Sequence, residues 1–160
     1  MRHERGTLKP LTRIRARGWN RRVLTFDDFE EVCAEEGIII LDTRQDEISG
    51  EYEILDGQPL IKLHRDLTGF RRTLVAFHEY GHHCWHVPGH WNGRGLTEVE
   101  ADFVGLAALI PCPLLFKYSP AEIADEYGYP LRTVIERVRL YHVFEKRRRH
   151  AQRTHRHNLV

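Results

Sequence analysis

The chain has 160 residues, of which 41% are hydrophobic and 29% charged, and its formal net charge is +1. This length and apolar content fit one globular domain with a single core. A net charge this close to zero excludes a protein that binds nucleic acid or membrane through its overall charge. The unusual feature of the composition is histidine, which occurs 11 times.

The cysteines and the apolar stretches indicate where the protein works. Cys33, Cys84 and Cys112 are odd in number and form no CxxC pair, which argues against a disulfide framework and a cysteine-based zinc knuckle. Residues 1–19 lack the apolar core of a secretory signal, and the longest apolar stretch, 103–116, is too short to span a bilayer. We therefore expect a cytoplasmic protein with reduced thiols and no membrane association.

The N-terminal part of the chain is predicted to be an arm followed by a helix. Residues 1–22 are basic and carry no apolar period, so we expect an irregular arm. A helix is expected from Thr25 to Glu36, because Thr25 is a good N-cap, acids crowd the first turn and Gly37 can end the helix. Its buried side chains are expected to be Phe29, Val32 and Cys33.

A small sheet is predicted next. Three apolar runs, 38–41, 52–55 and 59–63, are separated by turn residues. Asp56-Gly57 between the last two runs is typical of a β-hairpin. We therefore predict about three strands in a mostly antiparallel sheet.

Two further helices are predicted after the sheet. From Thr68 small or apolar residues recur at spacings of four and three, and Pro88-Gly89 can end that helix. A loop then leads to a second helix, from about Thr97 to Ile110, which is apolar on nearly all sides and is therefore expected to be buried. The face of the first helix consists of Phe70, Leu74, Phe77, Gly81 and Cys84.

The last third of the chain is predicted to be helical. A capping signal over 119–122 and a turn at 128–130 predict two helices, a helix-turn-helix-like unit, within residues 119–144. The tail, residues 145–160, is basic and histidine-rich and is expected to be disordered. One domain is therefore predicted over residues 23–144, between the arm and the tail.

The segment His78-Glu79-Tyr80-Gly81-His82 is a candidate metal site. His78 and His82 lie one helical turn apart, so both imidazoles can reach one ion at about 2.0–2.1 Å. Glu79 points about 100° away from His78, where it can act as the base that takes a proton from the attacking water. In so histidine-rich a chain the motif arises by chance roughly one time in ten to twenty. Its place in an amphipathic helix that follows a sheet favours a zinc site.

The next helix offers the third ligand. Glu98 and Asp102 share one face of that helix, whereas Glu100 points nearly opposite. Asp102 leads into an apolar run, where a carboxylate must be paired. We therefore predict Glu98 as the third ligand and Asp102 as the acceptor of the outer N–H of a liganding imidazole, with Glu100 as the competing ligand. Three protein ligands are typical of a catalytic zinc.

The remaining histidines near the motif are not expected to bind the same ion. His86 lies about 12 Å along the helix axis from His78, which is too far for a shared metal. We expect His83, His86 and His90 to line the cleft or lie on the surface.

Together these residues resemble the gluzincins and, more narrowly, the ImmA/IrrE family of small metallopeptidases. The segment EVEADFVGLAALIP, Glu98–Pro111, is similar to that family's pattern E-x-E-A-D/N-x-F-A-A-x-L-L-M-P. The resemblance covers roughly residues 26–142 and is specific over 74–111. It implies an α+β, zincin-like fold and a cytoplasmic protease, often phage-encoded, that cuts a helix-turn-helix transcriptional repressor. The departures from the pattern are apolar or small residues, among them Val104, Gly105, Ala108 and Ile110.

Two other functions compete with a protease. The first is a DNA-binding regulator that reads DNA through residues 119–142, but Val134, Ile135 and Val138 are expected to be core positions of its second helix. The second is a zinc-stabilised interaction module, in which Glu79 would have no role. The basic tail is expected to give at most weak binding to nucleic acid.

Overall fold

The computed structural model describes residues 11–85 and 96–157, with side chains described from 11 to 84 and from 98 to 145. Within these ranges the protein is α+β, as predicted, with a single three-stranded sheet. The chain divides into two compact units, Met1–Pro113 and Leu114–Val160, so the domain predicted over 23–144 includes parts of both. No helix in the described ranges is long and apolar enough to cross a membrane.

The described part of the predicted N-terminal arm is folded. A short helix, α1, spans Thr12–Ala16, and Ile14 and Trp19 are buried. The indole N–H of Trp19 donates a hydrogen bond to the carbonyl of Val104 at 2.9 Å. The prediction of an irregular arm was wrong here, because three scattered apolar residues among arginines, Leu11, Ile14 and Trp19, give little helical period even though all three reach the core.

Helix α2 (Phe26–Glu36) has the capping residues and the buried face that the sequence predicts. Thr25 and Asp28 form a reciprocal capping box at its N-terminus. Gly37 ends the helix in the left-handed region, with φ of 67°. The buried side chains are Phe29, Val32 and Cys33.

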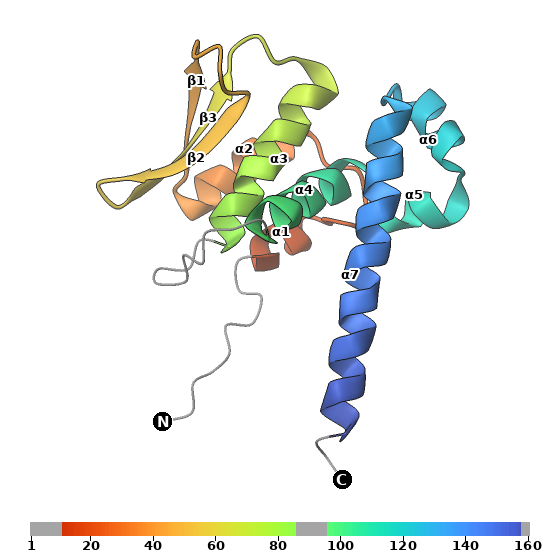
Figure 1. Ribbon diagram of the computed structural model, residues 1–160. Helices are drawn as coiled ribbons and strands as arrows, with labels where there is room; N and C mark the ends of the chain where they lie inside the picture. The colour runs from red at the N-terminus through yellow and green to blue at the C-terminus, as the bar shows by residue number, and fades with distance from the viewer. Residues whose placement is uncertain (1–10, 86–95, 158–160) are drawn as a thin grey trace, which may run out of the picture. The chain divides into compact units, whose positions relative to one another are not determined.

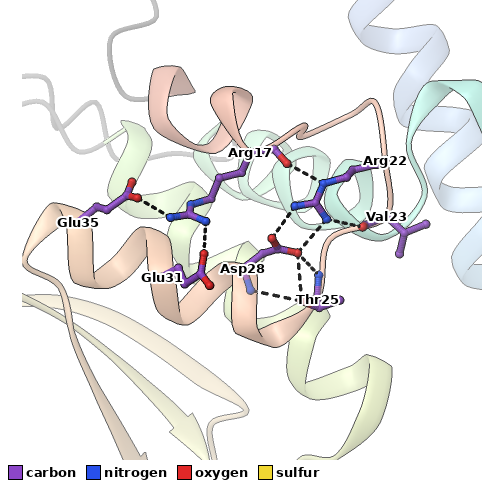
Figure 2. Close-up of polar contacts among 7 residues, drawn as sticks. All are labelled: Arg17, Arg22, Val23, Thr25, Asp28, Glu31 and Glu35. Carbon is purple, nitrogen blue, oxygen red and sulfur yellow. Dashed lines mark hydrogen bonds and ion pairs between the residues drawn. The ribbon is translucent and has the colours of Figure 1, made fainter.

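Two arginines join the N-terminal segment to α2, as Figure 2 shows. Arg17 forms ion pairs with Glu31 and Glu35 on α2. Arg22 pairs with Asp28 at 2.6 Å, the same carboxylate that completes the capping box. These two basic residues are therefore partnered within the fold and help to fix the N-terminal segment on α2.

The sheet contains strands β1 (Ile39–Thr43), β2 (Gly50–Leu55) and β3 (Gln58–His64), in the order β1-β3-β2. Strands β2 and β3 form the predicted hairpin, with φ of 50° at Asp56 and 81° at Gly57. Strand β1 pairs with β3 in parallel, so only one of the two strand pairs is antiparallel. An apolar run encodes a strand but not its direction, which explains the difference. Strand β2 is an edge of the sheet.

Helix α3 (Gly69–Trp85) lies between the sheet and helix α4 (Leu96–Leu109), as Figure 1 shows. The two helices approach closely, since a Cβ added at Gly81 would lie 2.7 Å from the Cα of Ala101. The predicted end of α3 at Pro88-Gly89 lies outside the described residues. On the predicted apolar face Phe77, Gly81 and Cys84 are buried, and Phe70 and Leu74 are half-buried.

Helix α5 (Cys112–Lys117) crosses the boundary between the units, and α6 (Pro120–Tyr127) and α7 (Leu131–His157) follow it. Ser119 caps α6 in the predicted capping box with Glu122. Val134 is buried, but Ile135 is 54% exposed, so its prediction as a core residue was wrong.

Helix α7 also overturns the prediction of a disordered tail. It continues to His157, far beyond Phe144, where we expect the second C-terminal helix to end. The predicted tail contains five arginines, together with one Lys, one Gln and one Ala. These residue types have high helix propensity. The prediction of disorder considered the charge of the tail but not this propensity.

Candidate metal centre

Three side chains from α3 and α4 converge in the first unit. His78 and His82 lie one turn apart on α3, and Glu98 lies in the first turn of α4. Their ligating atoms all lie within 4.8 Å of one another. The two Nε2 atoms are 3.1 Å apart, and Glu98 oxygens lie 3.5 Å from His78 Nε2 and 3.2 Å from His82 Nε2. This group could hold a metal ion.

Asp102, one turn after Glu98 on α4, orients the first imidazole. Its Oδ1 lies 2.8 Å from Nδ1 of His78. A proton on Nδ1 that is donated to Asp102 leaves the Nε2 lone pair of His78 directed at His82 and Glu98. Metal-binding histidines in proteins are commonly held in this way.

The two imidazoles differ electrostatically. Burial lowers the pKa of His78, but the hydrogen bond to Asp102 and the negative charges of Glu79, Asp102 and Glu98 outweigh it, and the net pKa is raised. The pKa of His82 is lowered by burial and by the nearby charge of His78. Protonation of one ring disfavours protonation of the other, and a metal cation bound at the two Nε2 atoms would take the place of that proton.

Glu79 is 7% exposed and lies against strand β2. A Cβ added at Gly50 would lie 2.9 Å from Cγ and from Oε1 of Glu79, so the glycine permits this close approach. Burial raises the pKa of Glu79 to about 7, with a further increase from the charge of Glu98. His78 and a hydrogen bond from the main chain of Tyr52 act in the opposite direction. Glu79 can therefore exchange a proton near neutral pH.

The structure brings together the predicted site residues. Glu98 joins the two histidines in the candidate metal group, and Glu100 does not. Asp102 pairs with His78 as predicted, although its side chain is 48% exposed and less buried than its apolar neighbours suggest. His83 is half-buried and contacts Tyr52 and Glu36, whereas His86 and His90 lie outside the described residues.

Two residues of strand β2 that lie beside Glu79, Gly50 and Tyr52, could not be recognised from the sequence. The sequence predicts no role for Gly50, and it predicts Tyr52 only as part of the apolar run 52–55. A glycine at the start of a strand is itself a signal that another group approaches the backbone closely. That signal does not identify the approaching group, which lies 29 positions further along the chain.

The donor set fits a zinc ion. Two imidazole nitrogens and a carboxylate face one another, and this is a common ligand set of catalytic zinc. Comparisons of the chain with protein-family models, with curated proteins and with solved structures found no match. The interpretation of the site therefore depends on its own geometry.

Proposed function

We propose that this chain is a zinc-dependent endopeptidase whose metal is held by His78, His82 and Glu98. The single observation that carries the proposal is the combination of this ligand group with a buried carboxylate, Glu79, on the same helix. A zinc site with only a structural role would not need a buried carboxylate outside its ligand group. A catalytic site needs such a group as its general base.

The chain's own residues can perform the proton transfers of peptide hydrolysis. A zinc ion would supply a Lewis acid and lower the pKa of the attacking water. Glu79 then takes a proton from this water at a carboxylate oxygen and delivers it to the nitrogen of the leaving amine. Asp102 keeps His78 in the tautomer that presents Nε2 to the ion.

The proposed substrate is a protein segment in an extended conformation. Strand β2 is an edge of the sheet and carries Gly50 and Tyr52 beside Glu79, so an extended chain added along it would lie near the site. The resemblance of Glu98–Pro111 to the ImmA/IrrE pattern points to a helix-turn-helix transcriptional repressor, cut in the cytoplasm. The thiols of Cys33 and Cys84, which are buried and in no disulfide, fit that compartment.

Metal analysis tests the ligand assignment. We expect about one zinc per purified chain and loss of that zinc in the His78→Ala, His82→Ala double variant. Glu98→Ala is expected to weaken zinc binding more than Glu100→Ala, its matched control on the same helix. The reverse order would move the third ligand to Glu100. Because two histidines and a carboxylate also bind ferrous iron, iron in place of zinc would contradict the proposal.

The substitution Glu79→Gln tests the enzyme. It keeps the size of the side chain but removes the base, so we expect normal zinc content and a loss of about 10²–10⁴-fold in cleavage of a co-expressed candidate repressor. Undiminished cleavage would show that the proposed mechanism is wrong. Loss of zinc together with activity would make Glu79 a ligand instead.

A further inference from the structure

We propose that Glu36, His83 and Tyr52 form a positioning chain that holds edge strand β2 against Glu79. These three residues come from α2, α3 and β2, so the positioning chain joins three elements beside the candidate site. Its importance for catalysis rests on the proposed function. The contacts among Glu36, His83 and Tyr52 do not depend on that proposal.

The polar side-chain atoms of the positioning chain all have hydrogen-bond or ion-pair partners. Oε2 of Glu36 lies 2.9 Å from Nε2 of His83, and Nδ1 of His83 lies 3.1 Å from the hydroxyl of Tyr52. The arrangement is satisfied when Nε2–H donates to Glu36 and Nδ1 accepts from the Tyr52 hydroxyl. The second oxygen of Glu36 accepts from the hydroxyl of Tyr80 at 3.0 Å.

The environment favours this arrangement of protons. The Glu36 side chain is only 13% exposed, so its carboxylate needs partners such as His83 and Tyr80. Burial raises the pKa of Tyr52 to about 12, which keeps the hydroxyl protonated as a donor. The rings of Tyr52 and His83 also meet edge to face, with centroids 5.4 Å apart.

The main chain of Tyr52 connects this network to the candidate site. Its side chain is held by His83, and its main chain donates a hydrogen bond to Glu79. Gly50, two residues earlier on the same strand, lies against the Glu79 side chain. Because β2 is hydrogen-bonded within the sheet only to β3, the anchor at Tyr52 is an additional constraint on the distance from β2 to α3. The positioning chain therefore fixes the position of β2 beside Glu79, although none of its side chains contacts Glu79.

Amide hydrogen exchange in the 160-residue chain, purified in the presence of zinc, tests the link. Tyr52→Phe removes only the hydroxyl, and Glu36→Gln removes the charge that orients His83. We expect both changes to speed exchange of the residue-52 amide about tenfold or more, while the amide of Phe77 in the core of α3 keeps its parent rate. Tyr80→Phe is the matched control, because it removes a hydroxyl from the same carboxylate but leaves the Glu36–His83–Tyr52 chain intact.

The outcomes separate this proposal from others. Unchanged exchange at residue 52 in Tyr52→Phe would overturn it. Equal acceleration at Phe77 would also overturn it, because the hydroxyl would then act on global stability. Zinc content is measured in each sample and is expected to stay at the parent level. A parent that binds no zinc would contradict the proposed function but would leave the exchange comparison valid.

Discussion

Glu79 illustrates how a single side chain acquires its properties from elements distant in the sequence. Its neighbours on α3 include the histidines of the candidate metal group, but it also lies against Gly50 and accepts a main-chain hydrogen bond from Tyr52, both on β2. The absence of a side chain at Gly50 allows the strand to cover the carboxylate. Covering it removes water, which disfavours the ionised form and raises the pKa to about 7.

The raised pKa of Glu79 predicts an unusual stability profile for the metal-free protein. The folded pKa is about 7 and the ordinary value is 4.5, so between these values the folded state binds more protons than the unfolded state. The contribution of Glu79 to the unfolding free energy must therefore fall as the pH rises through this window. Glu79→Gln lacks this fall, so in the presence of a chelator it should be more stable than the parent above about pH 7, by on the order of 1–3 kcal/mol.

Urea unfolding of parent and variant in chelator, from about pH 5 to about pH 8, checks this prediction. The two curves should diverge as the pH rises, and parallel curves would contradict it. Zinc-loaded protein serves as the comparison, because a nearby cation favours the carboxylate and should reduce the divergence.

At the scale of helices, the geometry of the candidate metal group depends on the contact between α3 and α4. Gly81 lies one residue before His82, and its Cα approaches the backbone of Ala101, between Glu98 and Asp102 in the chain. The backbone atom cannot move aside as a flexible side chain could. A larger residue at Gly81 must therefore separate the helix that carries the histidines from the helix that carries the carboxylates.

We therefore predict that Gly81→Ala weakens zinc binding by on the order of tenfold or more, even if the protein stays folded. Competition with a chromophoric chelator measures the affinity. Gly37→Ala is the control, since it strains a left-handed helix cap with no atom within 4 Å of the added Cβ. Gly37→Ala should lower stability but keep the zinc affinity. If both variants lose affinity equally, the close helix contact is not what sets the geometry.

The junction in Figure 2 gives a second prediction at this scale. Asp28 is partly buried, which raises its pKa, but Arg22 and the main chain and hydroxyl of Thr25 outweigh this effect and the net pKa is lowered. Its contribution to stability is therefore present above its usual pKa and lost as the pH falls through the lowered value. Asp28→Asn should reduce the unfolding free energy by about 1 kcal/mol near pH 7 and by less near pH 3. Denaturant unfolding at the two pH values is the measurement, and a loss independent of pH would contradict it.

The elements that could be predicted are those whose signal is local. The capping residues and glycine of α2, the Asp56-Gly57 turn and the helical period of α3 are short-range patterns, and each was confirmed. Asp102 was predicted to accept from a liganding imidazole, because a carboxylate beside an apolar run must be paired, and the imidazole that it contacts is that of His78.

What could not be predicted depends on contacts between distant segments. The parallel pairing of β1 with β3, the burial of Trp19 under Val104 and the contact of Gly50 with Glu79 all join residues far apart in the sequence. Histidine content alone also does not identify which histidines act together. His83 follows His82 directly, but its partners are Glu36 and Tyr52, on different elements.

At the scale of the whole molecule, the features of the two competing functions, protease and DNA-binding regulator, lie in different units. The candidate metal group lies wholly in Met1–Pro113, and the helix-turn-helix-like segment lies in Leu114–Val160. In the described part of α7, Arg137 is buried, whereas Arg132 and Arg139 are exposed and Arg139 pairs with Glu136 at 2.5 Å. A recognition helix needs exposed polar side chains that reach base edges.

We therefore predict that the purified chain binds DNA at most weakly, without sequence preference and with a strong dependence on salt. With a formal net charge of +1, any affinity should come from the basic residues of 146–160 through release of counterions, and it should disappear when they are removed. Fluorescence anisotropy with a random duplex and with a library-selected duplex, at low and at physiological salt, measures both affinity and preference. Sequence-specific binding at physiological salt that survives removal of residues 146–160 would contradict the prediction. It would then favour a DNA-binding regulator, with residues 119–142 as its reading head and the metal group in a supporting role.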